Sequence, residues 1–476
     1  MILETKLELM HWIDLTIIFI FMAGFSAYGL WQSRLNKSSE DYFLGGRNLP
    51  WPVAMLSIVA TETSVLTFIS VPGLAYRDDW FFLQLAIGYI IGRILVSLFL
   101  LPQYFKSGVT SIYEIIGHKF GSGIQKTASG VFLITRILAD GVRFLATAVV
   151  VQVITGWSLP MAVIIIGIVT LVYTLSGGIR TIVWVDSIQF VLYLFGGVAS
   201  IIIVLNHLDQ SLFEVLPILT EQGKLAIFNL EGNLIKEPYY FMSAIVGGAL
   251  LSFSSHGVDY MMVQRVLGTR NLTAARKAMV GSGIFVFLQF GVFLLAGSLI
   301  YLLMGGVEIE RDREFTTFIV DYLPVGLKGV LLAGVLSAAM STLSSSINSL
   351  ASSTVTDWLG GNQSIRRSQL VSLIWGLVLI AIALLFDESD SAIVIVGLQI
   401  ASFTYGGLLG LFLLSKMKRD IHPVSLMVGL ISSLLIVFYL KQVGIAWTWF
   451  IGISVVTNMF ITLLIDRFVI LVNKPS

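Results

Sequence analysis

Apolar segments of about 20 residues, each long enough to cross a bilayer as a helix, recur along almost the whole chain. Of the 476 residues, 56% are hydrophobic and 12% are charged, which is about half the charged share of a soluble protein. These features predict an all-α polytopic membrane protein. We expect thirteen helices, near 12–32, 51–75, 80–104, 128–155, 159–177, 182–206, 241–263, 278–304, 326–357, 369–386, 391–415, 424–440 and 447–471.

The remaining composition narrows the function classes. The chain has no cysteine, which excludes disulfides, thiolate metal sites and cysteine nucleophiles. Its formal net charge of +1 argues against a nucleic-acid partner. We find no HExxH, GxSxG or P-loop sequence, so a membrane enzyme is a remote alternative. A channel is disfavoured because no segment resembles a selectivity filter.

Lysine and arginine predict the orientation. If the N-terminus lies outside, 18 of the 29 basic residues fall in inner loops and 8 in outer segments. Arg265 is counted among the inner loops. Arg93 and Arg136 lie within spans and are expected to be peripheral, with side chains that reach toward the interface. We therefore expect a multi-pass protein of the plasma (inner) membrane, with an outer N-terminus and a cytoplasmic C-terminus.

Two spans are interrupted by polar residues in corresponding places. The second carries Thr61-Glu62-Thr63-Ser64, and the seventh carries Gly247-Gly248 followed by serines and His256. Each opens a set of five spans, and an odd number gives the two sets opposite orientations. Interrupted helices in inverted repeats mark the central site of a secondary transporter. We predict one domain, 1–476, with a leading helix (12–32), a first repeat (51–206), a second repeat (241–415) and two trailing helices (424–471).

The segment 331–357 is rich in hydroxyl side chains. Ser341, Ser344, Ser345 and Asn348 recur at helical spacing and form one uncharged polar face. Hydroxyl oxygens are ligands for hard cations, but small residues also let membrane helices approach closely. The segment by itself fits either a packing face or a cation site.

Four segments together resemble signatures of the sodium/solute symporter family. They are DYFLGGRNLPWP (41–52), LSGGIRTIVWVDSIQF (175–190), VQRVLGTRNLTAARKA (263–278) and AAMSTLSSSINS (338–349). The resemblance covers essentially the whole chain in order. It implies a LeuT-like core of two inverted five-helix repeats, with one helix before it and two after it. It also implies sodium-coupled symport of a solute.

The resemblance also implies where sodium binds. The main site would use backbone carbonyls and hydroxyls of Ala60, Thr63, Ala338, Ser341 and Thr342. Some family members have a second sodium site, which here would consist of Asp186 with Ser341, Ser344 and Ser345. The alternative is that Asp186 pairs with Arg180 or with a backbone donor near the inner surface.

Further polar residues are candidates for the substrate cavity. Glu62 is costly within a span and could face the ion path, cap a helix end or be protonated. Asp140 and Arg143 lie one helical turn apart and form either a buried ion pair or a substrate contact. His256 is equally compatible with an interior structural role. The full set is Glu62, Thr67, Gln84, Asp140, Arg143, Ser252, Ser255, His256 and Gln399.

The expected function is sodium-coupled import of a small polar organic solute by alternating access, with Na+ as the coupling ion and the bilayer as its surroundings. Residues that match the sugar-binding positions of the family are Ala86, Ala139 and Ser255, so a sugar is not supported. A proton-coupled carrier that uses Glu62 or Asp140 as its relay is the alternative. The sequence leaves the solute, the number of sodium ions and the oligomeric state open.

Overall fold

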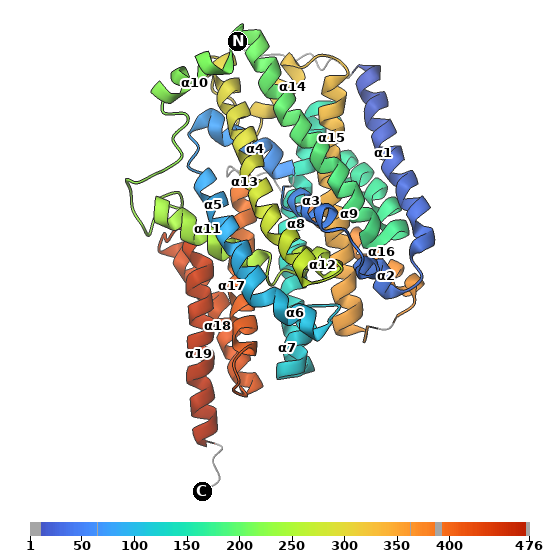
Figure 1. Cartoon of the computed structure of the whole chain (residues 1–476), viewed down its shortest axis with the longest axis vertical. Helices are drawn as coiled ribbons and strands as arrows, with labels where there is room; N and C mark the ends of the chain where they lie inside the picture. Colours follow the sequence, from blue (N-terminus) through green and yellow to red (C-terminus); the bar gives the residue numbers. More distant parts are fainter. Residues whose placement is uncertain (1–10, 64, 362, 386–392, 473–476) are drawn as a thin grey trace.

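The computed structural model describes residues 11–63, 65–361, 363–385 and 393–472, and this part of the chain is helical apart from its connections (Figure 1). Each predicted span falls on an observed helix. By length and composition, eight of the described helices could cross a membrane, or ten if each bent pair is one span. The main helices are α1 (Trp12–Gln32), α3 (Trp51–Glu62), α4 (Val65–Arg77), α5 (Leu83–Leu95), α8 (Ser122–Thr155), α9 (Leu159–Leu208), α11 (Phe241–Ser255), α12 (Tyr260–Leu267), α13 (Leu272–Leu303), α15 (Leu327–Ser353), α16 (Ile365–Ala383), α17 (Ile393–Ser415), α18 (Pro423–Gln442) and α19 (Phe450–Val472).

Two predicted spans, 159–177 and 182–206, are the two halves of α9. They join at Gly178, whose backbone is non-helical with φ 61° and ψ −165°. A Cβ atom at this position would lie 2.6 Å from the carbonyl oxygen of Tyr42. Glycine is therefore required both for the backbone conformation and for the close approach of the neighbouring segment.

Both interrupted spans are bent, as the sequence indicated. The axis turns by 59° between α3 and α4 and by 65° between α11 and α12. At the second bend His256 ends α11, and the Asp259 side chain caps α12 by accepting from the Met261 backbone N–H at 2.9 Å. These bends bring polar side chains and helix ends into the centre of the bundle. In a regular helix the backbone N–H and C=O groups would instead be hydrogen-bonded within the helix.

Helix α15 is the central element. Of its most apolar window, 94% is buried, against 22% for α1. It packs against α9, α8, α16, α1 and α3. Its many serines and alanines allow this crowding because small side chains let several helix backbones approach at once. The segment 331–357 therefore does serve as a packing helix, and its polar face points at neighbouring helices rather than at lipid.

The outer parts of the bundle are built around this centre. Figure 1 shows α1 on one side, next to α15 and α9, and the trailing helices α18 and α19 together on the other side. The long connections between α9 and α11 and between α13 and α15 each contain a short helix, α10 (Leu212–Glu221) and α14 (Glu314–Tyr322). Helix α14 packs on α4, next to the first bend.

Candidate ion and solute site

Asp186 on α9 contacts residues of three other helices, α3, α12 and α15. Its carboxylate is fully buried and accepts hydrogen bonds from Ser57 on α3, at 2.6 Å, and from Ser341 on α15. The guanidinium of Arg265, also fully buried, lies 3.3 Å from the same carboxylate. Arg265 donates in addition to Ser57, at 2.8 Å, and to Ser345. A buried charge is tolerated when it is paired and hydrogen-bonded, and this group meets both conditions.

This geometry corrects two expectations. Asp186 does not pair with Arg180, which instead donates to the Gly45 carbonyl at 2.9 Å. Arg265 does not belong to an inner loop, because it lies in α12 with no exposed surface. The predicted second sodium site therefore has a guanidinium at its carboxylate and at the Ser345 hydroxyl.

The residues of the predicted main sodium site are all buried on two packed helices. Ala60 and Thr63 lie at the end of α3, and Ala338, Ser341 and Thr342 lie on α15. Helices α3 and α15 are in contact. Thr342 donates to the Ala338 carbonyl at 3.3 Å, and Thr63 donates to Gln289 on α13 at 3.0 Å. Ser344, of the second predicted site, donates to the Ser341 carbonyl at 3.0 Å.

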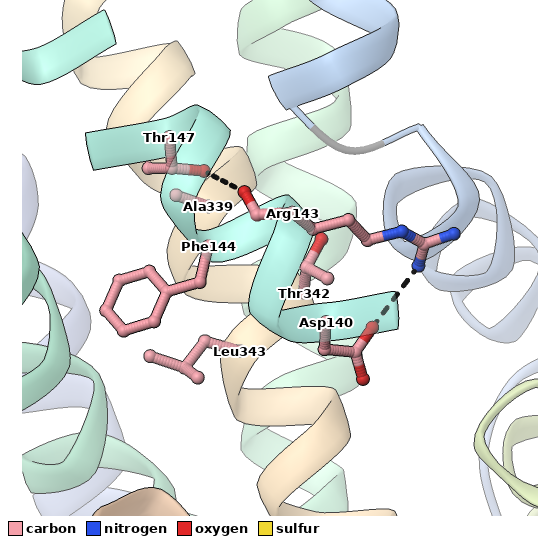
Figure 2. Close-up of a pocket in the computed structure, with 7 residues that line it drawn as sticks. All are labelled: Asp140, Arg143, Phe144, Thr147, Ala339, Thr342 and Leu343. Carbon is pink, nitrogen blue, oxygen red and sulfur yellow. Dashed lines mark hydrogen bonds and ion pairs between the residues drawn. The ribbon is translucent and has the colours of Figure 1, made fainter. Parts of the chain in front are cut away.

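A second cluster lies on the α8 side of α15, around a cavity of about 10 Å³, room for about one water molecule. Asp140 and Arg143 line it, and Figure 2 shows the Arg143 side chain extending away from the α8 ribbon. Thr342 lines the same cavity, so a residue of the predicted sodium site faces Arg143 and Asp140. The other lining residues are Phe144, Thr147, Ala339 and Leu343.

The predicted Asp140–Arg143 ion pair is present, with 3.6 Å between Oδ1 and Nη1, but it is shared. Arg136 lies 3.5 Å from the same oxygen, and Ser346 donates to the other. Asp140 is thus surrounded by donors. Arg143 is not: its Nε and Nη1 groups are buried and have no hydrogen-bond partner among the described residues, and 14% of its side chain is exposed. The pair leaves unused donor capacity on the arginine, which has five N–H groups in total.

Arg136 is not a peripheral arginine, contrary to expectation. Its side chain is 1% exposed and lies 3.4 Å from Asp259, which caps α12. Tyr405 on α17 donates to Asp259 and accepts from Arg136 at 2.9 Å. These contacts connect α8, the second bend and α17, and none of the three residues lines the cavity.

Glu62 joins the two bends. It pairs with Arg93 on α5, and its carboxylate lies 3.6 Å from Nε2 of His256. Arg93 is fully buried and also donates to Ser282 at 2.7 Å, so it too was wrongly expected to be peripheral. Ser255 contacts Nδ1 of His256 at 2.9 Å. Glu62 is 17% exposed, which leaves it partly accessible beside the first bend.

The remaining candidates are scattered. Gln84 is tied to the connection before α11, donating to the Tyr239 carbonyl at 2.9 Å, and it does not line the cavity. Thr67 and Ser252 are buried on α4 and α11, and neither lines the cavity. Gln399 belongs to α17, but its side chain lies outside the described residues.

Sequence reasoning missed Arg265, Ser57 and Ser346 as partners of the two aspartates. Ser57 precedes Thr61 by one helical turn and could have been placed on the same face. Ser346 follows the predicted polar face by one residue. Arg265 gave the opposite signal, because arginine near the end of an apolar segment usually marks the inner membrane surface.

Comparisons with known proteins agree with this architecture. The family model described as "Sodium:solute symporter family" matches residues 42–431. The sodium/sialic acid symporter NanT of Aliivibrio fischeri is 24% identical over 89% of this chain and 87% of its own length. The human sodium/iodide cotransporter is 25% identical over 88% of this chain and 68% of its own length. Human sodium-coupled monocarboxylate transporter 2 is 26% identical over 89% of this chain and 70% of its own length.

Two solved structures share the fold. A substrate-bound, outward-open sodium-coupled sialic acid symporter superimposes with a TM-score of 0.86 at 22% identity, covering 96% of this chain and 98% of that one. Mhp1, a nucleobase-cation-symport-1 family transporter, superimposes with a TM-score of 0.58 at 15% identity, covering 91% and 96%. The predicted LeuT-like fold is confirmed.

Proposed function

Because the chain belongs to the sodium:solute symporter family, and is therefore a sodium-coupled transporter rather than an enzyme, we propose that it moves Na+ together with a small monovalent anion. The carboxylate of a short organic acid is the anion that fits the site best. The observation that carries this proposal is Arg143: its buried Nε and Nη1 groups have no hydrogen-bond partner among the described residues, its ion pair with Asp140 spans 3.6 Å, and it lines a cavity shared with Thr342.

Arginine suits a carboxylate for geometric reasons. Its planar fork matches the two oxygens of the anion, and such charge-assisted bonds are about twice as strong as neutral ones. Asp140 lies 3.6 Å from Nη1 of Arg143 and so holds one side of the guanidinium. Phe144, Ala339 and Leu343 line the same space and would contact a short apolar tail. An uncharged polar solute would not offer the guanidinium the two charged acceptor oxygens of a carboxylate.

The named solutes of the relatives point in the same direction. Sialic acid, iodide and monocarboxylates are the solutes in the names of three related symporters, and all are anions at neutral pH. The cavity described here has room for about one water molecule, so the solute enters through a more open conformation. That requirement is the one expected of alternating access.

Sodium would sit on the carbonyls and hydroxyls of Ala60, Thr63, Ala338, Ser341 and Thr342. Thr342 then separates the cation from the anion at Arg143. Two opposite unit charges about 5 Å apart attract by about 3 kcal/mol at an effective dielectric constant of 20. This attraction gives the coupling a physical origin, because each ion makes the site more favourable for the other.

The charge of the solute also bears on the number of sodium ions. One Na+ with one monovalent anion is electroneutral, so only the concentration gradients drive uptake. A second Na+ at Asp186 would make the cycle electrogenic and add ~2.3 kcal/mol per 100 mV. Arg265 already balances Asp186, and we favour one sodium ion per anion.

Uptake is directed inward, with the N-terminus outside, the C-terminus cytoplasmic and the protein in the plasma (inner) membrane.

The proton-coupled alternative receives no support from the geometry. Glu62 is paired with Arg93, and Asp140 lies between Arg136 and Arg143 with Ser346 as a further donor. A proton relay at either carboxylate would have to break an ion pair with a buried arginine.

The test uses purified protein and matched ligand pairs. Thermal unfolding is measured with propionate, lactate and iodide, and with the neutral amides propionamide and lactamide, in sodium or choline sulfate. A bound ligand stabilises the folded state in proportion to its occupancy. We expect stabilisation by at least one anion in sodium only, loss of that effect in Arg143→Gln, and none with the amides. Equal stabilisation by an amide and its acid would overturn the proposal.

A further inference from the structure

We infer that Asp14, on the leading helix α1, is a positioning residue for the sodium site, because it caps the N-terminus of α15. The inference rests on the proposed sodium site on α15. It assigns a role to a helix that lies outside the two five-helix sets. Figure 1 shows α1 running alongside α15 and α9 at the edge of the bundle.

The carboxylate of Asp14 is placed directly at the start of α15. Its Oδ1 atom accepts from the backbone N–H groups of Gly326 and Gly329, both at 2.7 Å. Gly326 is the N-cap residue of α15 and has no side chain to supply a cap of its own. Asp14 thus satisfies two of the helix's first backbone donors from another helix.

The contact between Asp14 and the start of α15 is buried and requires a close approach of the two backbones. Asp14 is 1% exposed, and a Cβ atom at Gly329 would lie 2.6 Å from the Asp14 Cα. Gly329 therefore has to be glycine for the two backbones to approach. A negative charge at a helix N-terminus is favourable, because the unpaired N–H groups carry partial positive charge. The cap offsets the cost of burying the carboxylate and fixes where α15 begins.

A second contact ties α1 to the sodium residues themselves. Gly29 of α1 packs on Tyr173 of α9, where an added Cβ would lie 2.8 Å from the tyrosine Cβ. The Tyr173 hydroxyl donates to the Met340 carbonyl at 2.7 Å, directly before Ser341. Helix α1 thus holds α15 at its outer end through Asp14 and supports its middle through Tyr173.

The consequence concerns the sodium ligands. Ser341 and Thr342 lie about four turns from the capped end, on a helix packed on nearly every side. If the cap is lost, the first turn of α15 loses its fixed attachment, and the ligands lose part of their alignment with Ala60 and Thr63 on α3. Hard cations such as sodium depend on several oxygens at fixed distances, so apparent sodium affinity should fall.

The test is sodium-dependent solute uptake by the full-length protein in proteoliposomes. We expect Asp14→Ala to raise the sodium concentration for half-maximal uptake about fivefold, corresponding to the ~1 kcal/mol of a typical cap. Asp14→Asn, which keeps one acceptor oxygen, should give a smaller increase. The maximal rate per folded molecule should change much less, since Asp14 is not among the residues that line the solute cavity.

The matched control is Glu214→Gln in the outer helix α10. Glu214 also caps a helix start, accepting from the Ser211 backbone N–H at 2.6 Å, but it lies away from α15. We expect no change in sodium dependence in this variant. A purely structural role of Asp14 would lower the yield of folded protein and leave the half-maximal sodium concentration unchanged, and that result would overturn the inference.

The inference can fail separately from the proposed sodium site. If Ser341→Ala and Thr342→Ala weaken sodium dependence and Asp14→Ala does not, the sodium site stands and the role of Asp14 is wrong. If none of the three variants changes sodium dependence, the site itself is wrong.

Discussion

Two polar clusters lie on different sides of the same helix, and they differ in how completely they are paired. Around Asp186, every buried charge has a protein partner: Arg265, Ser57 and Ser341 surround the carboxylate. Around Asp140, the acid is ion-paired with Arg136 and Arg143, but the buried Nε and Nη1 groups of Arg143 have no hydrogen-bond partner among the described residues. The first cluster is complete by itself, whereas the second is complete only with an added acceptor.

This difference in pairing distinguishes charges that stabilise the protein from a charge that is placed to bind a ligand. A buried pair costs several kcal/mol of desolvation per ion, so a fully satisfied pair is explained by the contacts it makes within the protein. An unsatisfied buried donor costs about 1–3 kcal/mol and needs a further reason. Arg143 has such a reason if its partner is the transported anion.

The largest expected effect is on the complete cluster. Asp186→Asn leaves the Arg265 charge buried without its partner, so we expect a loss of about 3–5 kcal/mol in unfolding free energy. Thermal or denaturant unfolding of the purified protein measures it. The double variant Asp186→Asn/Arg265→Gln should recover most of the loss.

A different outcome would reassign Asp186. If Asp186→Asn is as stable as the wild type while the Hill coefficient for sodium falls from near two toward one, the carboxylate is a sodium ligand. The electroneutral one-to-one stoichiometry would then be wrong.

The next largest effect concerns Arg143 in the cluster around Asp140. Arg143→Gln should weaken apparent anion affinity about 100-fold, since hydrogen bonds to a charged group contribute ~1.5–3 kcal/mol. Arg143→Lys should weaken it about tenfold, because lysine keeps the charge and loses the fork. Uptake as a function of anion concentration gives both values. The control is Arg180→Gln, a guanidinium that contacts the Gly45 carbonyl; an equal loss there would remove Arg143 from the site.

A smaller effect is expected at Ser341 and Thr342, two residues of the proposed sodium site. Thr342→Ala and Ser341→Ala should each raise the half-maximal sodium concentration about tenfold, because each removes one hydroxyl ligand from a site of several oxygens. Thr147→Val is the control: Thr147 lines the same cavity, and its hydroxyl donates to the Arg143 backbone carbonyl at 3.0 Å. Unchanged sodium activation in both site variants would contradict the assignment.

The smallest effect should come from His256. Glu62 is already paired with Arg93, and the imidazole Nε2 is 3.6 Å away, beyond hydrogen-bond distance. His256→Gln keeps a polar group of similar reach, so we expect a change of about twofold or less in uptake rate. Loss of uptake would show that the connection between the two bends contributes directly to transport.

Much of the fold follows from simple features of the sequence. The apolar lengths give the spans, and Glu62 and His256 lie where two of them bend, whereas the predicted break at Gly247 and Gly248 falls within the regular helix α11. Gly178, whose backbone is non-helical, separates the two predicted spans that make up α9. The family signatures place the sodium residues on α3 and α15, and the structure packs these two helices together.

The charge pairs could not be derived in the same way. Arg265 follows the end of a predicted span, a position that usually indicates the membrane surface, and Arg93 lies within the span 80–104, where the sequence does not show which way it faces. Only the bends and the packing of α12 and α5 bring them into the centre. The role of Asp14 could not be predicted either, because nothing in its own segment shows that it contacts Gly326 and Gly329 more than 300 residues later.

The most direct test of the central claim is the reciprocal effect of sodium and anion on each other's binding. Titration calorimetry or thermal-shift titration of the purified protein gives anion affinity with and without sodium, and sodium affinity with and without anion. We predict that each ion tightens the other by the same factor, about tenfold or more, and that Arg143→Gln reduces this factor toward one. A factor of one in the wild type, with both ions bound, would contradict adjacent sites at Thr342 and Arg143.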